Sequence, residues 1–358
     1  MAPLPKRKPT MMDVAREAGV SSMTVSRAFR DASTINKETR ARIHQAADRL
    51  GYLYDSTAAG LSSRKTGFVA VTIPSIDNHN FAETVQGLSD GLKDSRLQLL
   101  LAHTGYDWHN EERLIRQLLT RRPEALVTTG GAHTPACRSF LETAGIPVIE
   151  LWDRPDQPID RSIGFSNASL AGLLVTHLVD SGRTRIGFIG GDTQRDTRGT
   201  DRRRGFMAAM VARGLDASRL EGAGTAPITM AESAAAFRRL KDRWPDTEAV
   251  ICVSDPAAFG ALSACQSAGI AVPDAMAIAG FGAYDISEVC VPSITTIDPR
   301  SYDIGSTAAG LILDVLSTSD GLGRADGVGA SLSAERHIEM PTSLVVRQST
   351  GPNGKARP

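Results

Sequence analysis

The sequence predicts an α/β protein with a helical N-terminal segment and two lobes built on doubly wound parallel sheets. From Gly67 onward, apolar runs alternate with helix-like segments, and the first series of runs is GFVAVTIP, LQLLLAHTG, EALVTTGG and IPVIELWD. A second series follows with RIGFIGG, EAVICVSD and MAIAGFG. Such runs are typical of strands buried on both faces, and their alternation with helices indicates parallel sheets. The 358 residues suffice for two or three compact units.

Three short helices are predicted within the first ~50 residues. Thr10 and Asp13 have the spacing of a capping box, and Gly19 ends that first helix. The third helix begins near Asn36, a good N-cap residue, and ends before Gly51. These signals are local, so they predict the helix boundaries without reference to the rest of the chain.

The second of these helices has two chemically different faces. Ser21 is its predicted N-cap. Its packing face carries Val25, Ala28 and Phe29, and the opposite face carries Ser22, Met23, Ser26 and Arg27. The apolar face predicts contact with the other helices, and the polar face is free to bind a partner.

The net charge of zero conceals a division along the chain. Residues 1–65 hold 12 Lys and Arg against 6 Asp and Glu, whereas the remainder holds 28 against 34. A small basic segment joined to an acidic body indicates attraction to a polyanion. The alternative is that the basic residues are only scattered surface charges.

Several classes of protein and site are not expected. No stretch approaches the ~18 apolar residues of a membrane span, and no secretory signal is visible, so a cytoplasmic protein is expected. Cysteines with neither C-x-x-C nor another ligand spacing are expected to be buried free thiols; they are Cys137, Cys252, Cys265 and Cys290. Four histidines lack metal-ligand spacing and are expected to form hydrogen bonds in a cleft or to lie at the surface; they are His79, His103, His109 and His133. No metal, cofactor or catalytic residue is therefore predicted.

Four segments are predicted along the chain. Residues 1–55 form the predicted helical domain, and residues 56–66 lie in a small, polar linker whose one large apolar residue is Leu61. Residues 67–350 form the two lobes, the first from about 67–165 and 296–325 and the second from about 166–295 and 326–350. Residues 351–358 are a tail.

Two motifs resemble the helix-turn-helix headpiece of the lactose-repressor (LacI/GalR) family of bacterial transcription factors. They are DVAREAGVSSMTVSRAFR and TRARIHQAADRLGY, and the resemblance extends from Thr10 to about Val346. Within the family the chain is most similar to repressors of gluconate utilisation, through PSIDNHNFAETVQGL, LAHTGYDWHNEERL, HTPACRSFLETAGIPVIELWD and MAIAGFGAYDI. The resemblance implies a homodimer that binds double-stranded operator DNA and a small-molecule effector.

The resemblance also implies the residues that contact DNA. The helix opening at Ser21 would enter the major groove, where Ser22 and Met23 face base edges and Arg27 reads a base or clamps a phosphate. Met23 replaces the polar residue often found there and favours contact with a thymine methyl group. The implied headpiece contacts are Thr10, Ser21, Ser22, Met23, Thr24, Ser26, Arg27 and Asn36. Thr10 and Asn36 have the alternative of serving only as helix caps.

The linker has a counterpart in the family's hinge helix. AAGL matches that helix, whose leucine enters the minor groove and kinks the operator, so Ala58, Gly60 and Leu61 are implied DNA contacts. Glycine weakens a helix by ~1 kcal/mol, so the hinge is expected to fold only on DNA.

The cleft between the lobes is the implied effector site. Its implied lining is Asn78, His79, Phe81, Thr129, Trp152, Asp153, Phe165, Arg202, Ser254, Asp255, Phe281, Gly282 and Arg300. Many relatives carry aspartate where Gly282 stands, and the absence of that carboxylate favours an acidic ligand. Arg202 and Arg300 are expected to hold the carboxylate of a sugar acid such as gluconate or a related compound. Trp152 and Phe165 have the alternative of being ordinary core aromatics.

Other functions remain as alternatives. An enzyme is disfavoured because GFIGGD lacks the dinucleotide-binding spacing and SSRK lies in the hinge. A periplasmic sugar-binding protein would share the two lobes but would not use a basic headpiece, and N-terminal helices that bind another protein are a third alternative. Within the family, a neutral sugar is the alternative effector. The tail lacks apolar heptads, so a dimer is expected rather than a tetramer, and by resemblance the metabolite is expected to release the repressor.

Overall fold

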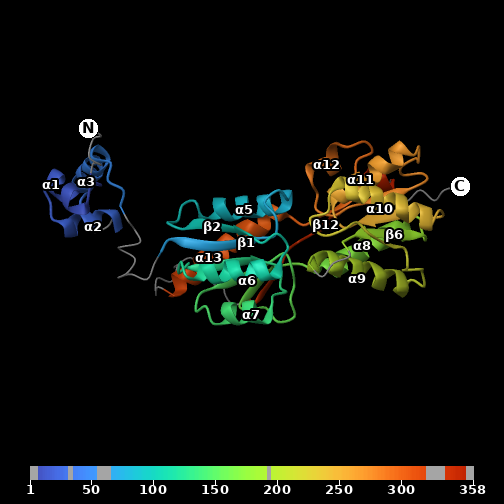
Figure 1. Cartoon of the computed structure of the whole chain (residues 1–358), viewed down its shortest axis with the longest axis horizontal. Helices are drawn as coiled ribbons and strands as arrows, with labels where there is room; N and C mark the ends of the chain where they lie inside the picture. The colour runs from blue at the N-terminus through green and yellow to red at the C-terminus, as the bar shows by residue number, and fades with distance from the viewer. Residues whose placement is uncertain (1–6, 31–34, 55–65, 192–194, 320–334, 352–358) are drawn as a thin grey trace, which may run out of the picture. The chain divides into compact units, whose positions relative to one another are not determined.

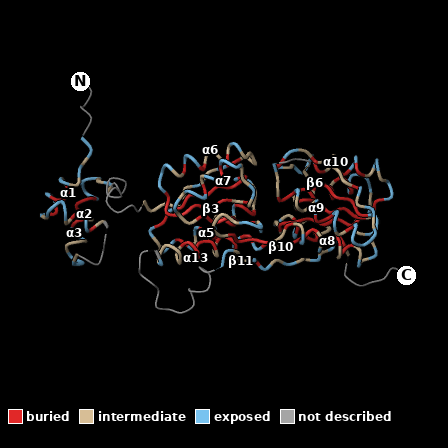
Figure 2. The backbone as a smooth tube through the Cα atoms, turned by 90° about the horizontal axis from the view of Figure 1, so that it is seen from below, coloured by how far each residue is buried: buried red, intermediate tan, exposed pale blue. Residues whose placement is uncertain are grey.

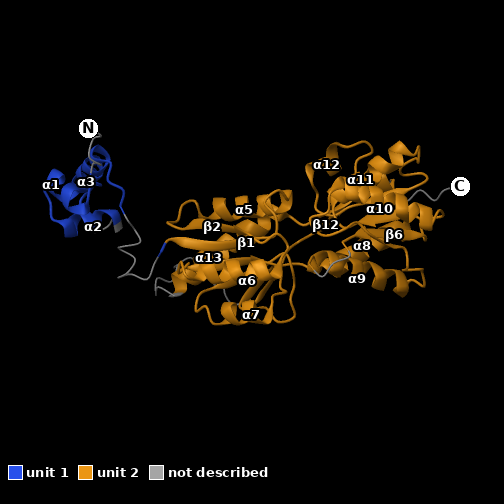
Figure 3. Cartoon of the chain, in the orientation of Figure 1, with its two compact units in different colours: residues 1–66 blue, residues 67–358 orange. Residues whose placement is uncertain are grey.

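The structure is a computed structural model that describes residues 7–30, 35–54, 66–191, 195–319 and 335–351. The chain divides into two compact units, residues 1–66 and 67–358, which Figure 3 shows in different colours. Among the described residues, no helix is long and apolar enough to cross a membrane.

The first unit contains the three predicted helices, α1 (Met11–Ala18), α2 (Ser22–Arg30) and α3 (Lys37–Leu50). Gly19 and Gly51 end α1 and α3 in the left-handed conformation that glycine adopts readily. Val14, Val25 and Ile43 bring the three helices together in one apolar core. The predicted hinge residues Ala58, Gly60 and Leu61 lie outside the described residues.

The second unit contains two lobes, each built on its own parallel sheet with helices on both sides (Figure 1). The sheet of the first lobe has the strand order β11-β5-β4-β3-β1-β2. Its strands are β1 (Phe68–Ile73), β2 (Gln98–His103), β3 (Ala125–Thr129), β4 (Val148–Leu151), β5 (Arg161–Gly164) and β11 (His337–Glu339). Its helices are α5 (His79–Leu92), α6 (Trp108–Leu119), α7 (Pro135–Glu142) and α13 (Ser301–Ser319).

Both faces of the first sheet are buried because the side chains of a strand alternate in direction. Val69 and Val71 of β1 pack in the cluster that includes Leu88 of α5. Ala70, which lies between them, packs instead in the cluster that includes Ile115 of α6. Figure 2 shows the resulting buried interior in red. The apolar runs in the sequence are therefore strands covered on two sides, as predicted.

The second lobe has a four-stranded parallel sheet with the order β7-β6-β8-β9. Its strands are β6 (Ile186–Gly190), β7 (Leu220–Gly222), β8 (Ala249–Cys252) and β9 (Ala277–Ala279). Its helices are α8 (Asn167–Asp180), α9 (Thr197–Ala212), α10 (Met230–Arg243), α11 (Asp255–Ser267), α12 (Asp285–Val289) and the short helix η3 (Gln348–Thr350).

The chain crosses between the lobes three times. It passes from β5 to α8, returns through β10 (Thr296–Asp298) to α13, and leaves again through β12 (Ser343–Val345), which pairs antiparallel with β10. The prediction that residues 326–350 belong to the second lobe is wrong for β11. This strand pairs with β5 in parallel, so it extends the sheet of the first lobe before the chain crosses for the last time.

Glycines allow α5 and α13 to pack closely in the first lobe. A Cβ atom at Gly87 of α5 would overlap the backbone of Tyr302, and one at Gly305 of α13 would overlap the carbonyl oxygen of Thr84 and lie 2.7 Å from the amide nitrogen of Leu88. The two backbones are therefore in direct contact, and no larger residue fits between them.

We predict that Gly305→Ala destabilises the second unit by about 1–3 kcal/mol or more, because overpacking forces the two helices apart. Gly310→Ala is the matched control on the same helix, since a Cβ there meets nothing within 4 Å. The control should be neutral or stabilising by about 0.5–1 kcal/mol because alanine favours a helix over glycine. Urea unfolding of both variants measures the difference, and equal stabilities would contradict the close contact.

Candidate nucleic-acid interface and ligand cavity

The exposed face of α2 carries the side chains that the sequence predicts for base contact. Ser22 and Arg27 are exposed, and Met23 is 65% exposed, whereas Val25 and Ala28 on the other face are buried. Thr24 and Ser26 are half-buried. The exposed thioether side chain of Met23 is chemically suited to contact a thymine methyl group.

Three other predicted DNA contacts use their side chains as helix caps. Both the amide nitrogen and the hydroxyl group of Thr10 donate to the Asp13 carboxylate, at 2.8 and 2.6 Å. These hydrogen bonds lower the pKa of Asp13 to about 2. The Ser21 hydroxyl oxygen accepts from the Thr24 amide, and Asn36 Oδ1 accepts from the Thr39 amide. The capping role is therefore seen in the structure, and contact with phosphate remains a prediction.

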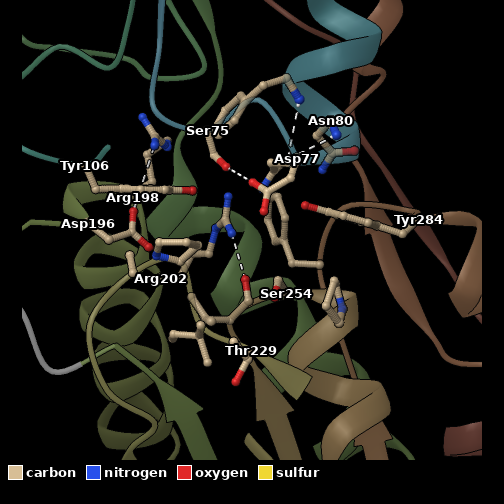
Figure 4. Close-up of a pocket in the computed structure, with 18 of the residues that line it drawn as sticks. Ser75, Asp77, Asn80, Tyr106, Asp196, Arg198, Arg202, Thr229, Ser254 and Tyr284 are labelled. Carbon is tan, nitrogen blue, oxygen red and sulfur yellow. Dashed lines mark hydrogen bonds and ion pairs between the residues drawn. The ribbon is translucent and has the colours of Figure 1, made fainter. Parts of the chain in front are cut away.

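A cavity of about 330 Å³ opens between the two lobes of the second unit (Figure 4). Residues of the first lobe that line it lie at the carboxyl ends of strands or in the helices that follow them, where ligands of parallel sheets bind. Of the thirteen predicted effector residues, six line this cavity: Asn78, Phe81, Trp152, Arg202, Ser254 and Phe281.

Three predicted residues are structural. Phe165 is buried in the core and stacks edge-on against Trp152. Asp255 is fully buried, and its carboxylate accepts from the Thr296 hydroxyl at 2.6 Å and from the Tyr284 amide at 2.8 Å. Thr129 donates its hydroxyl to the Thr72 carbonyl. None of these three lines the cavity.

The remaining four predicted residues line neighbouring cavities. Asp153 lines a cavity of about 470 Å³, and His79, Gly282 and Arg300 line one of about 260 Å³. Arg300 donates to Asp303 at 2.7 Å from a left-handed backbone conformation just before α13. The expected pair of Arg202 and Arg300 is therefore not assembled: Arg300 lines a different cavity, where its guanidinium group pairs with Asp303 of α13.

The backbone explains why residue 282 is glycine. Gly282 has a φ of 125°, which side chains rarely adopt, and a Cβ there would lie 2.5 Å from the Tyr284 ring and 2.6 Å from the Asn80 amide. An aspartate in this position would collide with two side chains of the site.

Arg202 is a fixed cation inside the cavity. Its Nε donates to Asn167 Oδ1 at 2.9 Å, and its Nη1 donates to the Val253 carbonyl at 2.8 Å. The guanidinium carbon lies 3.4 Å from the centre of the Phe281 ring. Burial lowers the pKa of Arg202 to about 10, which leaves it charged at neutral pH. Among the described residues, no hydrogen bond occupies Nη2, so this nitrogen is available to a ligand.

Arg198 is a second cation in the cavity that the sequence interpretation missed. It lies one turn before Arg202 on α9, and its Nη1 reaches the Thr129 carbonyl in the first lobe at 3.4 Å. Its guanidinium carbon lies 5.4 Å from the centre of the Phe81 ring. The sequence did contain a signal for Arg198. It lies four residues before Arg202, at the start of a helix that follows a buried strand, so both arginines lie on the same helix face.

Polar residues complete the cavity. The carboxylates are Asp77, which accepts from the Ser75 hydroxyl, and Asp196, which lies 4.0 Å from Arg198. Burial raises the pKa of Tyr106 to about 12 and raises that of Tyr284 as well, so both phenols are neutral donors. Further lining residues that the sequence interpretation missed include Asn80, Thr229 and Pro256.

Asn167 links the cavity to a crossing between the lobes. Its Nδ2 donates to the Trp152 carbonyl at 3.1 Å, while its Oδ1 accepts from Arg202. This amide holds the arginine in place from the first residue of α8. Two cations, two carboxylates, neutral hydroxyl and amide groups and aromatic rings together suit a polar ligand with several hydroxyl groups.

Comparisons with known proteins find relatives of both compact units of the chain. Residues 10–54 match the model for bacterial regulatory proteins of the lacI family, and residues 175–350 match a periplasmic binding protein-like domain. The chain is 31% identical to the HTH-type transcriptional regulator GntR of Escherichia coli K12 over 86% of this chain and 92% of that protein. It is 32% identical to the GntR of Pseudomonas aeruginosa over 96% of each chain. A solved regulator of the same family from Silicibacter pomeroyi superposes with a TM-score of 0.85 at 29% identity, covering 96% of this chain and 100% of that one.

We predict that Asp255 makes stability depend on pH. Burial raises its pKa from 3.8 to about 6 in the folded protein. The protonated form therefore contributes stability that is fully present below about pH 4 and is lost as the pH rises through about 6, by at most about 3 kcal/mol. Urea midpoints of the natural chain and Asp255→Asn, measured from pH 4 to 7, should differ by a constant amount near pH 4 and diverge as the pH rises, because asparagine resembles the neutral carboxyl group and cannot ionise. Asp242→Asn, an exposed change on α10, is the control. Identical profiles for the natural chain and Asp255→Asn would refute the assignment.

Proposed function

The chain belongs to the lacI family of bacterial regulatory proteins and is a DNA-binding transcriptional regulator. We propose that a sugar acid of the gluconate type controls its affinity for operator DNA. The proposed regulator is a homodimer that represses genes of sugar-acid utilisation and leaves the operator when the acid binds between its lobes. Its similarity to two regulators named GntR supports this choice of effector class.

The observation that carries the proposal is the pairing of Arg198 and Arg202 in one cavity. A carboxylate accepts strong, charge-assisted hydrogen bonds from guanidinium groups, and Nη2 of Arg202 is open to it. Asp77 and Asp196 then accept hydrogen bonds from hydroxyl groups along the carbon chain. The rings of Phe81 and Trp152 offer an apolar wall.

A neutral sugar is the second candidate effector. The carboxylates of Asp77 and Asp196 balance the two arginines in formal charge, so a neutral polyol would leave the cavity uncharged. The two candidates differ in what Arg202 must do, because a neutral ligand gives its guanidinium no carboxylate to bind.

On the DNA side, we propose that Ser22, Met23 and Arg27 of α2 face the bases in the major groove. Ser21, Thr24 and Ser26, at the start of the helix and beside these residues, would approach phosphate together with Thr10 and Asn36. The paired hinges would place Leu61 in the minor groove with Ala58 and Gly60 at their contact.

We predict that Arg202→Met weakens gluconate binding about 10- to 100-fold, because hydrogen bonds to charged groups contribute about 1.5–3 kcal/mol. Calorimetry against gluconate, 6-phosphogluconate and glucose measures the affinities. Arg204→Met, an exposed change on the same helix, should leave them unchanged. Binding of glucose without any sugar acid, or equal affinities in both variants, would exclude the acid effector.

We predict that Arg27→Ala weakens operator binding about tenfold or more. If Arg27 contacts phosphate, the slope of log affinity against log salt should fall in magnitude by about 1; if it reads a base, the loss should depend on operator sequence. Arg49→Ala on α3, where the side chain pairs with Glu17, is the control. Removal of residues 1–65 should abolish binding, and retained affinity in that truncated chain would overturn the proposal.

A further inference from the structure

A buried polar cluster lies in the first lobe, away from the ligand cavity. It consists of Glu111 on α6, His133 in the loop before α7, Cys137 on α7 and Glu150 on β4. The side chain of His133 is 1% exposed and that of Glu150 is 0% exposed. The expectation that His133 lies in the cleft or at the surface is wrong, because the β3–α7 loop turns its ring inward between two carboxylates.

The cluster contains polar atoms that have no hydrogen-bond partner. His133 Nδ1 lies 3.2 Å from Glu111 Oε2. On the other side of the ring, His133 Nε2 lies 3.5 Å from Glu150 Oε1, and neither of these two buried atoms forms a hydrogen bond. These two atoms face each other at ion-pair distance, so Glu150 lies beside the ring nitrogen that points away from Glu111.

We propose that Glu111, His133 and Cys137 form a binding site for a thiophilic divalent cation of the zinc type. One ligand atom from each residue lies within 4.8 Å of the others. Thiolate, imidazole and carboxylate are the three ligand types that Zn²⁺ takes from proteins. None of these three residues lines the ligand cavity, so the proposed metal site can be tested independently of the proposed effector.

The second carboxylate has a defined part in this site. A histidine that binds a metal through one nitrogen usually donates its other N–H to a carboxylate or carbonyl group. Here the metal would take His133 Nδ1, and Nε2–H would donate to Glu150, which satisfies both unpaired atoms. Thr128 donates its hydroxyl to Glu111 Oε1 at 3.1 Å and so leaves Oε2 to the metal.

The ion requires a small movement of the chain. Bond lengths of about 2.0–2.3 Å place tetrahedral ligand atoms roughly 3.5 Å apart, so the cluster must contract by about 1 Å. The loop that carries His133 reaches the surface at Ala132, which is exposed, and α6 packs beside α7 (Figure 1). An ion would therefore enter beside Ala132, and the loop would have to move with His133.

Cobalt(II) titration of the full chain under reducing conditions tests the site. One equivalent should produce the near-ultraviolet charge-transfer band of a cobalt–thiolate bond, and Zn²⁺ should remove it. Cys137→Ser should abolish the band, whereas Cys290→Ser, a matched change in the second lobe, should retain it. The absence of a band, or an equal band in Cys137→Ser, would show that the cluster is only a buried ion pair network.

Calorimetry of Zn²⁺ binding gives a second, independent measurement. It should report one ion bound per chain in the natural protein and in Cys290→Ser. His133→Gln should lose the binding, with circular dichroism to verify folding. If that variant does not fold, the Cys137→Ser result decides alone. Retained Zn²⁺ binding in a folded His133→Gln variant would refute the proposed ligand set.

Discussion

Burial of both faces of each parallel sheet confines ligand chemistry in this protein to the ends of its strands. Apolar side chains alternate into the two clusters on either side of β1, so most polar groups that meet a ligand come from the loops and helix starts that follow the strands. Asn78 after β1 and Ser254 after β8 occupy such positions, and each also caps a helix. The close packing of α5 against α13 then holds the first of these segments in place.

The cavity depends on side chains that are already fixed by the protein. Arg202 is held by an amide, a carbonyl and an aromatic ring before any ligand arrives. Such preorganisation reduces the entropy lost on binding. It also connects the site to the chain crossing after β5, because Asn167 holds both Arg202 and the Trp152 carbonyl. The position of the cation therefore depends on the backbone of that crossing.

Local patterns in the sequence predicted most of the fold. The headpiece helices carry their own caps and glycine stops, and the apolar runs became strands because both faces of each sheet are covered. The edge strand β11 was missed because its three residues have no apolar run and depend on pairing with β5. About half of the predicted effector residues line the cavity, because local patterns indicate strand ends but not how side chains from distant segments meet. The six predicted side chains that line the cavity lie after strand ends or in the helices that follow them, whereas Arg300 pairs with Asp303 beside another cavity. Only the assembled sheet brings Glu111, His133, Cys137 and Glu150 together.

The two cationic groups of the cavity come from one helix, so the second lobe alone sets the distance between them. Arg198 and Arg202 are one turn apart, so about 6 Å of helical rise sets the distance between their backbones, whatever the angle between the lobes. In the proposed complex, a carboxylate would therefore meet both guanidinium groups on the second lobe, at a spacing that does not depend on the first lobe. The first lobe contributes Asp77 and otherwise neutral side chains to the cavity, so the hydroxyl groups of the proposed ligand would be recognised mainly there.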